Sequence, residues 1–231
     1  MQLYSLLEVS EQTTSVVRWI SVFGVLLVLG VIALIGYLTN GKKPDAKRIA
    51  FAGVCASLSF TLAVLKVSPI LYGGSITLAS FVPILIYAYV YGAGEGFLIG
   101  LVHGLLNFIE DPYILTPATF VFDYLLAFAS VGAMGFFRNL PRKEKGCAPI
   151  VFGCVCVFTL RFLAHLFSGM IFFSMDSVWV DFPAWATSNA FIYSFIYQCV
   201  YIPADALIAT LTLVALCKTG AFDRIVKMMR R

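Results

Sequence analysis

The sequence predicts an all-α integral membrane protein, in which a six-helix core bundle follows one additional N-terminal transmembrane helix. The first observation is composition: the 231 residues are 61% hydrophobic and 12% charged, with a mean hydropathy of +0.93, whereas soluble domains carry about 25% charged residues. The second is that uncharged runs recur near the length of about 20 residues that crosses a bilayer. The third is that basic residues gather between these runs, which is typical of cytoplasmic loops.

Residues 1–40 are predicted to form an extension that carries the additional helix. Its apolar run, residues 19–38, holds no charged side chain. A cleaved signal peptide has basic residues before a shorter apolar core. Here the basic cluster follows the run, at residues 42–48, so we expect a retained membrane helix.

Residues 46–217 are predicted to form the six-helix core domain, and residues 218–231 a basic tail. The expected crossings lie at residues 48–67, 75–91, 97–109, 113–137, 150–173 and 189–217. Each is an apolar segment bounded by charged, glycine-rich or proline-containing stretches, which is how membrane helices are delimited in sequence.

The orientation follows from the basic residues. Of the sixteen Lys and Arg residues, four lie in residues 39–48, four in residues 138–147 and five from residue 218 onward. All three segments fall on one side of the membrane if seven helices alternate in direction. Acidic residues occupy the opposite loops, so the positive-inside rule predicts an external N-terminus and a cytoplasmic C-terminus.

One carboxylate, Asp123, lies in the middle of the 113–137 segment. A charge at membrane depth costs several kcal/mol unless it faces protein, water or a counter-charge, which makes Asp123 a candidate functional residue. At 1.5 Å per residue, Asp123, His165 and Gln198 lie about 12–15 Å below the same membrane face. We therefore expect a polar pocket, open to the outside, for a small, flat, cationic ligand. Aromatic faces for such a ligand are offered by Tyr124, Phe172, Phe173, Tyr193 and Trp185.

Other interpretations of these polar residues stay open. Asp123 could be a structural partner of Arg161, which we expect to be structural itself. His103 could bond a neighbouring carbonyl group, and the role of Asp205 is ambiguous. An intramembrane enzyme using Asp123 and His165 as acid and base is a further alternative, although the sequence has no HExxH, GxSxG or Walker A motif.

Two more features concern metals and partners. The six cysteines have no metal-ligand spacing, and we interpret them as packing residues, with no metal site. In the first core helix, Ala52 and Ala56 are four residues apart, as are Gly53 and Ser57. Small residues at this spacing let membrane helices approach closely, either inside the bundle or against a partner protein.

Four stretches of the core resemble a known family: YGGSITLASFVPILIYAYVYG at residues 72–92, PYILTPATFVFDYLLAF at 112–128, RFLAHLFSGMIFF at 161–173 and YSFIYQ at 193–198. In this order and spacing they are similar to the thiamine-specific substrate-binding (S) components of energy-coupling factor (ECF) vitamin transporters. The resemblance covers roughly residues 46–217. It implies a six-helix S-component that captures thiamine from outside with high affinity and is not an enzyme.

The resemblance also implies a set of substrate-binding residues: Asp123, Tyr124, Tyr113, His165, Phe173, Tyr193 and Gln198. Phe173 stands where the family commonly has tryptophan, and Gln198 where it has asparagine. Gly74 stands where some members have another tryptophan, so we expect one wall of the site to come from the 174–188 loop, with Trp179 and Trp185. Asp123 is a shorter acid than the glutamate of other members.

For partners, the resemblance implies an ECF transmembrane coupling subunit and two ATPase subunits. The ATP is used by those partners, so no cofactor is expected in this chain, and no nucleic acid. Docking is expected through Ala52 and Ala56, in the plasma membrane of a bacterium. Another vitamin or precursor, such as riboflavin or hydroxymethylpyrimidine, remains the alternative ligand.

Overall fold

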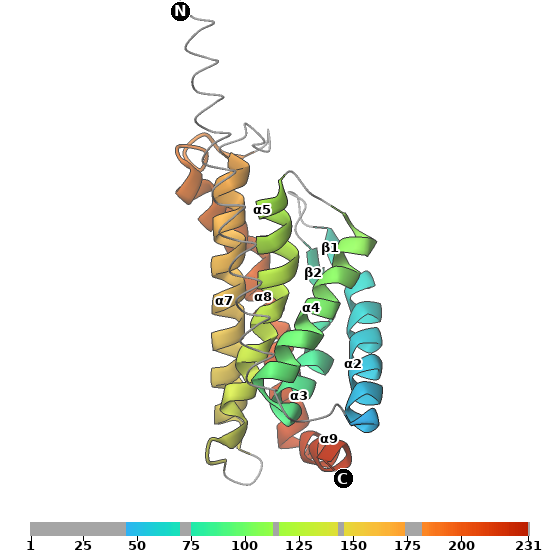
Figure 1. The fold of residues 1–231 in the computed structure, drawn as a ribbon. Helices are drawn as coiled ribbons and strands as arrows, with labels where there is room; N and C mark the ends of the chain where they lie inside the picture. The colour runs from blue at the N-terminus through green and yellow to red at the C-terminus, as the bar shows by residue number, and fades with distance from the viewer. Residues whose placement is uncertain (1–44, 70–74, 113–115, 143–145, 174–181, 231) are drawn as a thin grey trace, which may run out of the picture.

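The computed structural model describes residues 45–69, 75–112, 116–142, 146–173 and 182–230. These segments form a bundle of helices that run along a common axis, with one short helix across its end (Figure 1). The additional helix expected at residues 19–38 and the expected site residue Tyr113 lie outside the described residues.

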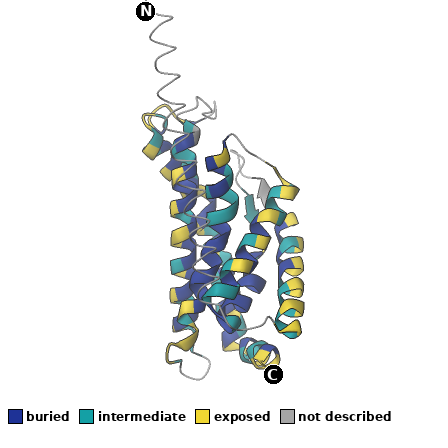
Figure 2. Cartoon of the chain, viewed as in Figure 1, coloured by how far each residue is buried: buried dark blue, intermediate teal, exposed yellow. Residues whose placement is uncertain are grey.

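Four helical segments in the described part are long and apolar enough to cross a membrane. They are α2 (Ala46–Val64), the composite segment Pro117–Asn139, α7 (Ala148–Phe173) and α8 (Ala190–Lys218). Together with α3 and α4 they make the six-helix core that the sequence predicted. Their outer faces expose large apolar side chains, such as Leu58, Phe152 and Leu211 (Figure 2), which suits contact with lipid chains.

The prediction of a helix from residue 75 to 91 was wrong in its first part. Helix α3 covers only Phe81–Tyr91, and Ser75–Thr77 forms a strand, β2, that pairs antiparallel with β1 (Lys66–Pro69). The strand is held by α8, because Asp205 Oδ1 accepts hydrogen bonds from Thr77 N (2.9 Å) and Oγ1 (3.2 Å). This long-range contact and the β-branched pair Ile76–Thr77 favour the strand.

Helix α3 is the buried centre of the bundle. All residues from Phe81 to Val90 are buried, and the helix packs against α2, α4 and the 3₁₀ segment η2 (Ser130–Asn139). A helix that is apolar on every side belongs in such a position. Its 11 residues span about 16 Å, which is about half the hydrocarbon thickness of a bilayer. The β1–β2 hairpin lies beyond the N-terminal end of α3 (Figure 1).

Helix α4 (Ala93–Glu110) is longer than the expected 97–109 segment. It starts directly after Gly92, whose φ of 101° turns the chain back from α3. This backbone conformation suits glycine, and a side chain there would also clash with the guanidinium of Arg138.

The composite segment carries the key irregularity of the fold. It consists of α5 (Pro117–Phe120), a π-helical turn η1 (Val121–Leu126), α6 (Ala127–Ala129) and η2. Asp123 and Tyr124 both lie in the π turn, a widened helical turn that often marks functional sites. Helix α4 approaches this turn closely, because a Cβ on Gly104 would overlap the carbonyl oxygen of Tyr124.

The predicted basic tail is a helix, α9 (Ala221–Arg230), that packs on α3 and α8. It lies at the same end of the bundle as the start of α2 and the turn after η2 (Figure 1). The described parts of the three basic segments therefore gather at one end, as the alternating topology requires. We call this end the α9 end, and the opposite one the cavity end.

Candidate ligand-binding site

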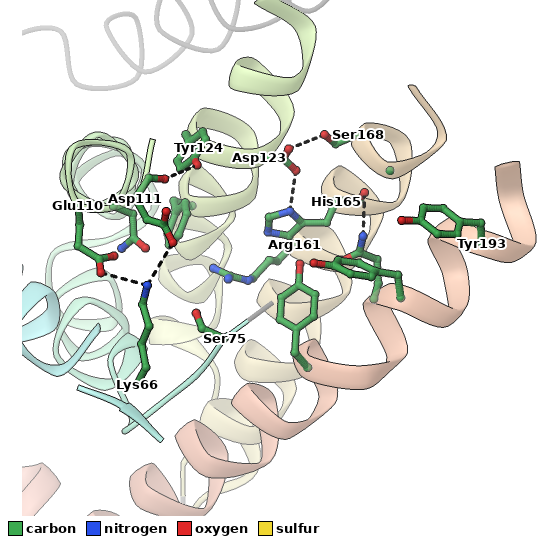
Figure 3. Close-up of a pocket in the computed structure, with 16 residues that line it drawn as sticks. Lys66, Ser75, Glu110, Asp111, Asp123, Tyr124, Arg161, His165, Ser168 and Tyr193 are labelled. Atoms are coloured by element: carbon green, nitrogen blue, oxygen red, sulfur yellow. Dashed lines mark hydrogen bonds and ion pairs between the residues drawn. The ribbon is translucent and has the colours of Figure 1, made fainter. Parts of the chain in front are cut away.

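A cavity of about 380 Å³ lies in the half of the bundle away from α9, between the π turn η1, α7 and α8 on one side and β1 and α4 on the other (Figure 3). A volume of this size holds a small organic ligand. Both polar and aromatic side chains line the cavity.

Asp123 is the acidic centre of the cavity. Its Oδ1 lies 2.8 Å from His165 Nδ1, and its Oδ2 accepts a 2.5 Å hydrogen bond from Ser168 Oγ (Figure 3). Both partners come from the same face of α7, three residues apart. The carboxylate stays partly exposed to the cavity, with a side-chain exposure of 24%, so it has lone pairs left for a ligand.

The contact with Asp123 determines which ring nitrogen of His165 carries the proton. A carboxylate only accepts hydrogen bonds, so Nδ1 of His165 carries the proton that points to it. The other ring nitrogen, Nε2, is buried and has no hydrogen-bond partner in the described structure. His165 also lines the cavity, so this nitrogen is an unused acceptor beside it.

Arg161 lies one turn from His165 on the same face of α7 and also lines the cavity. Its guanidinium carbon is 4.4 Å from the ring centroid of Phe81 and 4.6 Å from that of Phe128, which stabilises the charge by cation–π contact. Nε and Nη1 are buried without a hydrogen-bond partner in the described structure. Arg161 therefore packs on two rings of the bundle core and also lines the cavity. We had expected a structural role for it. The alternative of an Asp123–Arg161 pair is not what the structure has, because Asp123 bonds His165 and Ser168 instead.

Helix α8 supplies a wall of aromatic rings and one carboxamide. Tyr193, Tyr197 and Tyr201 follow one another at four-residue spacing and all line the cavity, with the first two rings stacked 6.3 Å apart. Gln198 Nε2 donates a 3.2 Å hydrogen bond to the carbonyl oxygen of His165. Gln198 Oε1 is buried and has no partner in the described structure.

Three charged residues stand at the side of the cavity formed by β1 and the end of α4. Lys66 Nζ lies 3.1 Å from Glu110 Oε1 and 3.2 Å from Asp111 Oδ2. Burial alone would lower the pKa of Lys66, but the hydrogen bonds and charges of Glu110 and Asp111 outweigh it and raise the pKa. Tyr124 Oη donates a 2.8 Å hydrogen bond to the carbonyl oxygen of Asp111, which links this cluster to the π turn.

Most of the expected site residues meet in this cavity. Its lining includes Asp123, Tyr124, His165, Tyr193 and Gln198.

The other expected aromatic residues lie elsewhere or outside the described part. Phe173 is not in the lining but packs against Tyr193, with ring centroids 5.6 Å apart. Trp185 is 67% exposed and is not in the lining either. Gly74, Trp179 and the side chain of Phe172 lie outside the described residues, as does most of the 174–188 loop.

Two ambiguous residues have structural partners. His103 is fully buried, and its Nε2 lies 3.3 Å from the side-chain nitrogen of Asn107, not from a backbone carbonyl. Asp205 holds Thr77 of the hairpin. Neither residue lines the cavity, whereas Asn107 does.

Sequence reasoning missed several lining residues, among them Ser168, Gly169 and Tyr201. The available signal was helical spacing: Ser168 follows His165 by three residues, and Tyr201 follows Gln198 by three, so each shares a face with a predicted site residue. No such signal exists for Lys66 and Ser75, because the hairpin that carries them was taken as helix.

The small residues of α2 point in two directions. Ala56 is buried and Ala52 packs against the core, so these two residues serve internal packing. Gly53 and Ser57 are exposed, and they form the small-residue face of α2 that is open to a partner.

Comparisons with known proteins identify the family of the chain. A protein-family model described as "Thiamine transporter protein (Thia_YuaJ)" matches residues 49–222. The chain is 28% identical over 156 residues to "Thiamine transporter ThiT" of Bacillus subtilis (strain 168), which covers 64% of this chain and 77% of that protein.

The fold also matches a solved structure of ThiT from Listeria monocytogenes, with a TM-score of 0.64 and 19% sequence identity. The match covers 75% of this chain and 94% of the Listeria chain. At this identity the likeness concerns the fold.

Proposed function

The chain belongs to the thiamine transporter family that matches its residues 49–222, and from this premise we propose that it captures thiamine in the cavity around Asp123. It is a membrane transport protein of the S-component type and not an enzyme. In this proposal residues 46–217 are the substrate-binding membrane domain.

The observation that carries the proposal is the environment of Asp123. Thiamine joins two flat rings, a permanently cationic thiazolium and an aminopyrimidine, through a methylene bridge. A partly exposed carboxylate, anchored at both oxygens by His165 and Ser168, supplies the counter-charge that such a cation needs. Both anchors come from α7, so the charge is oriented before the ligand arrives, which lowers the cost of binding.

The unpartnered atoms around Asp123 support the aminopyrimidine half of the ligand. Gln198 Oε1 and the unprotonated His165 Nε2 are acceptors that suit the amino group, while the Arg161 guanidinium is a donor that suits a ring nitrogen. The tyrosines of α8 offer ring faces for stacking. A neutral vitamin such as riboflavin carries no positive charge to compensate the carboxylate of Asp123.

The partners follow from the family resemblance. We propose that the chain docks on an ECF transmembrane coupling subunit driven by two ATPase subunits, so that ATP is used there and no cofactor is needed in this chain. Docking through Ala52 and Ala56 was the expectation, but both contribute to internal packing. The exposed pair Gly53 and Ser57 is the better candidate for close approach.

The orientation is also part of the proposal. The basic α9 end would face the cytoplasm of a bacterial cell, and the cavity would open to the outside, with an external N-terminus. Thiamine is then captured outside and released inside when the chain is docked.

The test is identification of the ligand in protein purified without added vitamin. We expect mass spectrometry to detect unchanged thiamine, and equilibrium binding to rank thiamine above hydroxymethylpyrimidine and both above riboflavin. Preferential binding of a neutral vitamin would overturn the role of Asp123. Chemical conversion of the ligand by the purified chain would instead favour the intramembrane enzyme.

A further inference from the structure

Helix α9 lies across the end of the bundle, not along it. Figure 1 shows α9 almost end-on, whereas α2, α7 and α8 run along the long axis of the bundle. The change of direction occurs at Gly220, whose φ of 74° ends the path of α8. Since α8 crosses the membrane, α9 runs close to the membrane plane at the level where α8 leaves it.

The side of α9 that faces the bundle is apolar. Phe222, Ile225, Val226 and Met229 follow the spacing i, i+3, i+4, i+7, which puts them on one face of a helix. Phe222 and Met229 are buried, and Ile225 and Val226 pack partly buried against the core.

Polar contacts fix the rotation of α9 about its axis. Asp223 forms an ion pair with Arg142, and the Arg142 guanidinium lies 5.1 Å from the ring centroid of Phe222. Burial alone would lower the pKa of Arg142, but the charge of Asp223, together with a hydrogen bond to Tyr89, outweighs burial and raises the pKa. At the other end of α9, Tyr91 Oη donates a 2.8 Å hydrogen bond to the carbonyl oxygen of Met229. The face that α9 turns away from the bundle is therefore fixed as well.

That outer face is basic. Arg224, Lys227 and Arg230 are exposed, and none of them forms an ion pair within the described part of the chain. Met228, between them, is 55% exposed. Three cations and one apolar side chain on an amphipathic helix in the membrane plane match the pattern of interfacial helices that bind anionic lipid.

We propose that the outer face of α9, formed by Arg224, Lys227, Met228 and Arg230, binds the anionic headgroups of the adjacent membrane leaflet. The bundle beside it is lipid-facing, since Leu211 in the last third of α8 is 65% exposed. Lipid is therefore in reach of α9 without any partner protein. The three cations attract anionic headgroups, while Met228 reaches the acyl boundary.

Lipid bound there would fix the α9 end of the bundle in the membrane. Helix α9 packs on α3 and α8, and α8 carries the tyrosine wall of the cavity. The proposal depends on the membrane orientation of the bundle and not on which ligand the cavity holds.

The test uses the full chain in mixed micelles with equal amounts of phosphatidylglycerol and phosphatidylcholine, and counts retained lipids by native mass spectrometry. We expect the wild type to retain phosphatidylglycerol preferentially. In the variant Lys227→Gln with Arg230→Gln, the ratio of retained phosphatidylglycerol to phosphatidylcholine should fall about tenfold. The matched control, Lys47→Gln with Lys218→Gln, removes the half-buried charge of Lys47 and the exposed charge of Lys218 from the same end and should keep the preference.

An unchanged preference in the α9 variant would overturn the proposal. So would an equal loss in the control variant, because the effect would then be the general charge of that end. If the α9 variant keeps its lipids but no longer co-purifies with the coupling subunit, the face is a protein-docking surface and the proposal is wrong. Thiamine binding, measured on each variant, reports whether the bundle is folded, and its absence in the wild type would overturn the proposed function alone.

Discussion

His165 Nδ1 and Asp123 Oδ1 lie 2.8 Å apart, joining α7 to the π turn η1 on one side of the cavity. The widened turn brings the carboxylate to α7, and Ser168 binds its second oxygen. This arrangement orients the acid and leaves the buried Nε2 of His165 without a hydrogen-bond partner in the described structure. The cavity is therefore preorganised for a cation with hydrogen-bonding groups beside it.

The first prediction concerns the charge of Asp123. Asp123→Asn keeps the size of the side chain but removes the negative charge, so thiamine affinity should fall about hundredfold, as expected for a lost charged hydrogen bond and counter-charge. Isothermal titration calorimetry on the purified chain measures the change. The control is Glu95→Gln, because Glu95 pairs with Arg48 near the α9 end, away from the cavity. Equal affinity in both variants would remove Asp123 from the site.

The second prediction concerns the carboxamide of Gln198. Gln198→Leu removes the unpartnered acceptor Oε1 and leaves the carbonyl of His165 without its donor, so affinity for thiamine should fall about tenfold to hundredfold. Gln198→Asn keeps the carboxamide and should recover part of the loss. Competition binding checks the assignment, since an analogue that lacks the pyrimidine amino group should lose little from the Leu variant. The same loss for both ligands would contradict the assigned contact.

Hydropathy predicted the helices of this fold well, because lipid and the bundle interior both select apolar residues over whole turns. It failed at residues 75–80, because the Ser75–Thr77 strand carries no charge and leads directly into the apolar helix α3. What makes it a strand is a contact with Asp205, 128 residues away, and no local pattern contains that partner. The π turn around Asp123 is equally invisible in the hydropathy of the segment.

The site was predictable where a polar residue interrupts an apolar helix, as with Asp123, His165 and Gln198. Counting residues from the end of each helix placed these three side chains at a similar depth in the membrane. Because the helices run along one axis, a similar depth was enough to predict that they meet. Lys66 could not be found this way, since its place at the cavity depends on the turn of the hairpin. Arg161 was interpreted as structural, because one sequence does not tell which side of a buried guanidinium faces open space.

The third prediction concerns the close contact of α7 and α8 at Gly169. A Cβ there would overlap Ser194 Oγ, which is already engaged with the carbonyl oxygen of Leu166 at 2.7 Å. Gly169→Ala should therefore destabilise the bundle by about 1–3 kcal/mol and weaken thiamine binding, since Gly169 also lines the cavity. Thermal unfolding in detergent and titration with thiamine measure both effects. Gly53→Ala is the control, because nothing lies within 4 Å of a Cβ at that position. Equal stability of the two variants would show that the contact is loose.

The last prediction separates capture from transport. Gly53→Trp with Ser57→Trp puts two large rings on the exposed face of α2, so a coupling subunit that needs close approach is excluded. The variant should bind thiamine like the wild type but lose uptake in cells that supply the coupling module. Ala52→Trp with Ala56→Trp is the comparison. Since Ala56 is buried and Ala52 packs partly buried against the core, this variant should lower stability and thiamine binding as well as uptake. Normal uptake by the Gly53/Ser57 variant, measured with radiolabelled thiamine, would show that docking uses another face of the bundle.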